Sequence, residues 1–271
     1  CDESHGETVA ISGDGNYAIV TGYYSNIAKL YKKDFLGTWS QIGSDIICPP
    51  QSGINNDVWH SSDIDFDGNR IVLGCKNGGS DTSSSLREGL VMVIERDGND
   101  NLLVTHTIYG ETHNWQFGGS ISINSNGTFF VATAINAINP ANPSTADGAY
   151  AVHNINNGVR LGNIKYGNSS TTLGRIGKNW GQGNNGIAIN GVYPNVYVAV
   201  SATNNVNGYD NVKVFQASSG NHTEMYNIPW PNSLSEHQIG VNLNENNWLV
   251  INDASNTYGI NPNSYVGLTK V

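Results

Sequence analysis

Short stretches in which apolar and polar residues alternate recur along the chain, and a glycine turn separates the two stretches of each pair. The three clearest copies are residues 8–20, 62–73 and 120–131, each with an Asp-Gly or Asn-Gly pair near its centre. Alternation with a period of two is typical of a strand with one buried face, and these dipeptides close tight hairpins. Each copy therefore predicts an antiparallel β-hairpin.

Two weaker copies of the same hairpin lie at residues 186–200 and 240–251. One apolar position near the end of the first strand aligns the five copies: Ile11, Ile64, Ile123, Ile189 and Leu243. The intervals between these positions are 53, 59, 66 and 54 residues. The chain is therefore built from five divergent repeats, of which the fourth carries an insertion.

Each repeat continues with further strand-like stretches after a variable loop. Third strands are predicted at 28–31, 90–95, 149–153, 212–216 and 265–269, and fourth strands in four copies at 38–42, 102–108, 159–164 and 224–228. Four strands in every 50–60 residues are the signature of a propeller blade, which buries its faces against neighbouring blades. The fold class predicted is all-β, a five-bladed β-propeller of mostly four-stranded antiparallel blades whose last blade lacks an evident fourth strand. It forms a single domain over residues 1–271, with approximate blades at 1–50, 51–110, 111–178, 179–230 and 231–271.

The third copy carries the heptapeptide Phe-Gly-Gly-Ser-Ile-Ser-Ile, from Phe117 to Ile123. It resembles the FG-GAP repeat of integrin-type propellers, and the opening copy at 9–16 is similar to the first hairpin of that repeat. The resemblance implies a calcium motif rich in Asp after the second strand. The corresponding loops here, 75–88, 135–148, 202–211 and 254–263, are rich in Asn, Ser and Gly instead. We therefore expect no metal and no other cofactor.

Charged residues make up only 13% of the 271 residues, and the formal net charge is −9. A chain without a basic stripe does not suit nucleic acid, whose binding relies on neutralising phosphates. No apolar run approaches the length of about 18–20 residues that spans a bilayer. The chain begins at Cys1, so we expect a mature or trimmed product, with a lipoprotein that starts at a lipidated cysteine as the alternative.

Three cysteines are present, Cys1, Cys48 and Cys75. An odd number in a secreted chain leaves one cysteine unpaired. A disulfide between Cys48 and Cys75 is one expectation, and two buried free thiols are the other.

Asp63, Asp65 and Asp67 stand at alternate positions before Gly68, as at the start of a calcium-binding loop. The acidic residue that would complete such a loop is absent, and the same alternation is that of a strand entering a turn. Five-bladed propellers also include glycosidases, which place carboxylates around the central channel. The last three repeats supply no acid on their inner strands, so we expect no enzymatic activity and keep a glycosidase as a distant alternative.

Four tryptophans lie in the connections that lead from an outer strand to the next inner strand: Trp59, Trp115, Trp180 and Trp230. These connections share one face of a propeller, where aromatic rings next to amide side chains suit the binding of neutral sugars. The alternative is that the indoles pack between the blades.

Asn126, Asn168 and Asn221 each begin an N-glycosylation sequon. Asn126 lies within a tight hairpin turn, where a glycan is less easily placed. Asn168 and Asn221 are the better candidates for glycosylation.

The last repeat ends in a strand, from Tyr265 to Lys270, for which no fourth strand is evident. An unpaired strand edge can pair with another chain. We therefore expect a non-enzymatic structural or adhesive protein, outside the cell or on a cell or virion surface, whose partners are other protein subunits. The alternatives are a carbohydrate-binding propeller whose partners are glycans, and a last blade that is simply three-stranded or trimmed.

Overall fold

The computed structural model describes residues 5–22, 26–49, 59–79, 87–144, 146–167, 175–176, 186–203, 210–229, 238–244, 248–254 and 267–270. Within these ranges the regular elements are all β-strands. Among these residues, no helix of the length and apolarity needed to cross a membrane is found.

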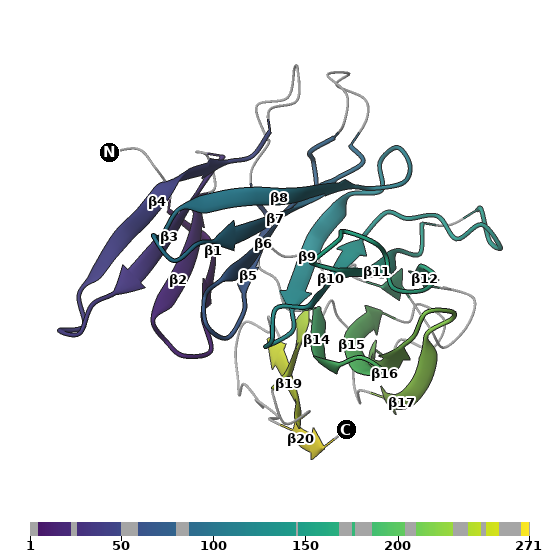
Figure 1. Cartoon of the computed structure of the whole chain (residues 1–271). Coiled ribbons are helices and arrows are strands. Elements are labelled where there is room, and N and C mark those ends of the chain that lie inside the picture. The colour runs from purple at the N-terminus through teal and green to yellow at the C-terminus, as the bar shows by residue number, and fades with distance from the viewer. Residues whose placement is uncertain are drawn as a thin grey trace, which may run out of the picture.

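Five antiparallel sheets follow one another along the chain (Figure 1). The first contains β1 (His5–Ile11), β2 (Tyr17–Gly22), β3 (Ile27–Lys33) and β4 (Trp39–Ile47). The second contains β5 (Ser61–Ile64), β6 (Arg70–Cys75), β7 (Leu90–Arg96) and β8 (Leu102–Tyr109). The third contains β9 (Phe117–Ile123), β10 (Phe129–Ala134), β11 (Ala149–Asn154) and β12 (Lys165–Tyr166).

The fourth sheet contains β13 (Arg175–Ile176), β14 (Ile187–Val192), β15 (Asn195–Thr203), β16 (Asp210–Ala217) and β17 (Thr223–Pro229). Both β13 and β14 pair with β15, so part of the insertion in the fourth repeat lengthens this edge of the sheet. The fifth sheet contains β18 (Gln238–Leu243), β19 (Trp248–Ala254) and β20 (Gly267–Lys270).

The repeated turns do more than reverse the chain, because each is hydrogen-bonded to the next sheet. The amide of Asp14 donates to the carbonyl of Phe66 at 2.8 Å, and the amide of Phe66 donates to the carbonyl of Ser125 at 3.0 Å. The side-chain amide of Asn124 then donates to the carbonyl of Gly191 at 2.8 Å. The Asp and Asn residues of the repeat therefore link consecutive sheets.

Apolar side chains fill the space between consecutive sheets. Ile19 and Leu30 of the first sheet pack in one buried cluster with Leu73 of the second. Three further clusters join the second sheet to the third, the third to the fourth and the fourth to the fifth. The second, third and fourth sheets thus each bury both faces against neighbouring sheets, which is the arrangement of a β-propeller.

The five hairpins and the third strands predicted from the sequence are confirmed within the described residues, which include the last predicted strand only from Gly267 onward. The fourth strand predicted at 159–164 is wrong. Arg160 makes only an isolated bridge to His153, and regular pairing resumes in β12. Gly162 lies between them with a φ of 72°, and the amide of Asn163 donates to the carbonyl of Gly220 in the turn between β16 and β17. This left-handed turn interrupts the strand.

Candidate functional site

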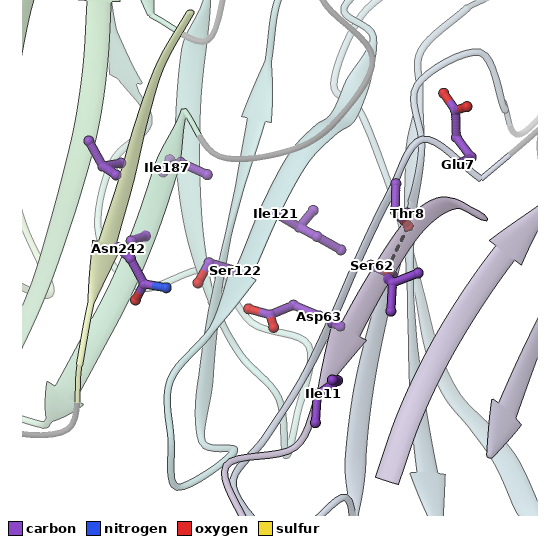
Figure 2. A pocket seen from close by; sticks show the side chains of 13 residues that line it. Glu7, Thr8, Ile11, Ser62, Asp63, Ile121, Ser122, Ile187 and Asn242 are labelled. Atoms are coloured by element: carbon purple, nitrogen blue, oxygen red, sulfur yellow. Dashed lines mark hydrogen bonds between the residues drawn. The ribbon is translucent and has the colours of Figure 1, made fainter. Parts of the chain in front are cut away.

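A cavity of about 570 Å³ lies where the opening strands of the five repeats meet. The sheet order explains its position, because β1, β5, β9, β14 and β18 each contribute residues to its wall. Its lining includes Thr8, Ile11, Ser62, Asp63, Ile121, Ser122, Ile187 and Asn242 (Figure 2). Polar groups from β1, β5, β9 and β18 therefore converge on one space.

Asp63 is the half-buried acid of this cavity. Its Oδ2 accepts a hydrogen bond from the amide of Ile123 at 2.8 Å, and its Oδ1 accepts one from the amide of Ile64 at 2.9 Å. Burial disfavours the charged form and raises the pKa of Asp63 to about 6, although these bonds oppose the rise. The carboxyl group therefore exchanges its proton close to neutral pH.

Glu7 is the other acid that lines the cavity among the described residues. Burial raises the pKa of Glu7, and the nearby charge of Lys76 lowers it. Figure 2 shows the Glu7 carboxylate directed away from Asp63. The two acids are therefore not arranged as a facing pair.

The three alternating aspartates do not converge on a common point. Asp65 accepts a hydrogen bond from the amide of Arg70 at 3.0 Å inside its own turn, and Asp67 accepts one from the side-chain amide of Asn69 at 2.7 Å. No group of three or more metal-ligating side chains occurs in the described part of the chain. In the structure Asp63 lies on β5, and Asp65 and Asp67 belong to the turn that follows it.

Two of the four candidate sugar-binding tryptophans, Trp59 and Trp115, are buried between sheets. Trp59 is fully buried between the first and second sheets and donates from Nε1 to the carbonyl of Ile46 at 3.2 Å. Trp115 packs between the second and third sheets, edge-on to Tyr166. Neither indole presents a ring face to solvent. Trp180 and Trp230 lie outside the described residues.

Cys48 and Cys75 face each other in the core between the first and second sheets. Both side chains are fully buried, and their Sγ atoms lie 2.7 Å apart as two thiols. The fold therefore places Cys48 and Cys75 side by side. Cys1 lies outside the described residues.

Two of the three sequon asparagines are described, and both are exposed. Asn126 accepts a hydrogen bond from the hydroxyl of Thr128 at 2.6 Å within the hairpin turn. Asn221 accepts one from the side-chain amide of Asn163 at 2.9 Å. Asn168 lies outside the described residues.

The outer edges of the sheets differ in regularity. β4, β8 and β17 each pair with their neighbour through a register shift, the mark of a β-bulge. By contrast, β20 pairs with β19 in unbroken register, and no described strand pairs with its other edge. β12, the outer strand of the third sheet, is also regular but only two residues long. Bulges protect an edge from further pairing, so β20 is the longest regular outer edge among the described strands and the one best suited to accept a strand.

No protein-family model matches the chain, and no curated protein sequence matches it. Solved structures do match. Hydrazine synthase from Kuenenia stuttgartiensis is similar over 90% of this chain and 60% of its own, with a TM-score of 0.54 and 15% identity. The periplasmic gluconolactonase PpgL from Pseudomonas aeruginosa is similar over 90% and 64%, with a TM-score of 0.50 and 14% identity. The Dos1 propeller is similar over 90% and 51%, with a TM-score of 0.50 and 11% identity.

This chain spans about half to two thirds of the length of these structures. At such low identity the likeness shows the propeller fold alone. The matched proteins differ in activity, and a gluconolactonase is among them. The propeller fold is therefore found in enzymes as well as in other proteins.

Proposed function

We propose that this chain is a structural or adhesive propeller, outside the cell or on a cell or virion surface, that associates with other protein subunits through the edge of β20. The observation that carries the proposal is the regular β19–β20 ladder with one edge left unpaired by described strands. Backbone N–H and C=O groups along such an edge form new hydrogen bonds when another strand is added.

The composition supports a role outside the cell. Low charge, abundant Asn, Ser and Thr, and exposed sequons at Asn126 and Asn221 suit a secreted surface protein. The likeness of residues 117–123 to the repeat of integrin-type propellers points to the same class. The main alternative, a carbohydrate-binding propeller, has less support because Trp59 and Trp115 are used in packing.

The native mass of the purified chain, measured by light scattering over a range of concentrations, tests this assembly. We expect oligomers whose fraction grows with concentration. In an antiparallel strand, adjacent amides point to opposite sides, so Leu268→Pro and Thr269→Pro remove one amide directed outward and one directed at β19. One of the two variants should lose assembly while its melting temperature stays near that of the wild type.

The control is Gln41→Pro in β4, where the amide points away from β3 and a bulge follows in the strand, and it should assemble as the wild type does. A discrete monomer at every concentration would contradict the proposal. Saturable binding on a glycan array by such a monomer would favour the carbohydrate-binding alternative.

A further inference from the structure

The hairpin between β3 and β4 has a turn that the second sheet repeats. Oδ1 of Asp34 accepts hydrogen bonds from the amides of Leu36 at 2.9 Å and Thr38 at 2.8 Å. Oδ1 of Asp97 accepts the equivalent bonds from Asn99 and Asn101, both at 2.8 Å. The third residue after each of these aspartates has a left-handed backbone, with a φ of 87° at Gly37 and 63° at Asp100. The two turns therefore share one fixed backbone geometry.

The side chains at the two tips differ completely. The second sheet has Gly98 and Asn99 there, as expected for an exposed turn. The first sheet has Phe35 and Leu36, which are 95% and 76% exposed. Two large apolar side chains thus stand in solvent on a turn whose backbone does not need them, and in Figure 1 this tip lies at the outer end of the first sheet.

One rung behind the tip, Trp39 pairs with Lys33 across the hairpin. Trp39 is 41% exposed, and Nζ of Lys33 lies 5.6 Å from the centre of its ring. Residues 29–39 contain three lysines and one aspartate, in a chain whose net charge is −9. Lys32 also pairs with Asp100 of the neighbouring turn at 2.9 Å, so the charge of that acid is offset.

The side chains are therefore layered along the hairpin, first Phe and Leu, then Trp and Lys. A lipid interface has the same order, because acyl chains accept aliphatic and phenyl groups while Trp and Lys settle among the headgroups. A pocket on a protein would not require this order. We propose that the β3–β4 tip is a docking site for a lipid surface, into which Phe35 and Leu36 insert.

Vesicle flotation of the whole chain tests this docking. The probes are vesicles of phosphatidylcholine, alone and mixed with phosphatidylserine. Phe35→Gly combined with Leu36→Asn gives the first turn the tip of the second, so the variant should fold normally. Loss of the two apolar side chains that would insert into the lipid should weaken vesicle binding by about 100-fold. Wild-type Trp39 should also shift its fluorescence to shorter wavelength when vesicles are added.

The control variant, Leu103→Asn with Val159→Asn, removes two exposed apolar side chains elsewhere and should still float with vesicles. The proposal fails if the wild type does not float with either kind of vesicle, or if the tip variant floats equally well. Self-association that the tip variant abolishes, without vesicle binding by the wild type, would show that the tip fits a protein pocket. Because assembly through β20 is measured without lipid, either proposal can fail alone.

Discussion

At the scale of single residues, the repeat gives chemically similar side chains different tasks. Asp65 closes a turn within its own sheet, whereas Asp63, two positions earlier, reaches the amide of Ile123 in the next sheet and lines the central cavity. His153 is buried beside Phe130, and burial lowers its pKa to about 4. The pKa values of Asp63 and His153 are therefore shifted in opposite directions.

The Asp63→Asn variant separates the contribution of Asp63 to stability from that of His153. The pKa of Asp63 is raised to about 6 in the folded chain, so its contribution to stability is greatest at low pH and is lost as the pH rises through 6. The wild type should therefore lose stability relative to the variant between about pH 4 and pH 7, by at most about 3 kcal/mol.

Urea denaturation across this pH range gives the comparison. His153 stabilises the fold above its unfolded pKa and loses that contribution as the pH falls towards 4. It is present in both proteins, so its contribution cancels in the difference. A difference that does not vary with pH would contradict the placement of Asp63.

A second prediction at this scale concerns Cys48 and Cys75. Their buried, facing thiols should be oxidised to a disulfide in protein isolated from an oxidising compartment. A cross-link between positions 27 residues apart should stabilise the fold by about 3 kcal/mol. Reductant should therefore lower the melting temperature of the wild type but not that of Cys48→Ala/Cys75→Ala. Peptide mapping without reductant would disprove the disulfide if both cysteines were recovered as thiols.

At the scale of elements, glycines set how closely sheets approach. Gly118 of β9 has a φ of 83°, and a Cβ there would press on the carbonyl oxygen of Leu90 and lie 3.1 Å from Cα of Gly74. At Gly119, its neighbour, a Cβ would lie 3.1 Å from the Cγ2 methyl of Ile135, and the other nearby atoms are at 3.6 Å or more. Close contact between sheets therefore requires a glycine at the first position of the Gly118-Gly119 pair, but not at the second.

Substitution of each glycine by alanine tests this difference. Gly118→Ala should destabilise the chain by about 3 kcal/mol or more, because strain in φ adds to a clash with backbone atoms. Gly119→Ala should cost less than about 1 kcal/mol. Chemical denaturation gives both values, and equal effects would contradict the close contact between the second and third sheets.

The elements that the sequence predicted well are those specified locally. Asp14-Gly15 and Asn126-Gly127 specify their turns without help from distant residues, and the hairpins around them are present. The strand predicted at 159–164 failed because Gly162 turns towards Gly220, a contact between sheets. Alternation placed Asp63 on a strand, but which side of that strand meets the cavity depends on the assembled sheets. The exposure of Phe35 and Leu36 likewise could not be predicted from the alternation of apolar and polar residues.

At the scale of the whole molecule, the five repeats share one cavity at their opening strands, and their sheets differ at their outer edges. Bulges interrupt β4, β8 and β17, while β20 keeps a regular ladder. The function proposed here follows from that asymmetry, since the propeller fold alone is shared by proteins of different activities. The fifth sheet is where this molecule should meet its neighbours.

Electron microscopy of the purified wild-type chain at high concentration would show this contact itself. We expect propeller particles joined to one another, with added density continuing the fifth sheet beyond β20. Single, separate particles, or contacts made by some other part of the molecule, would contradict it.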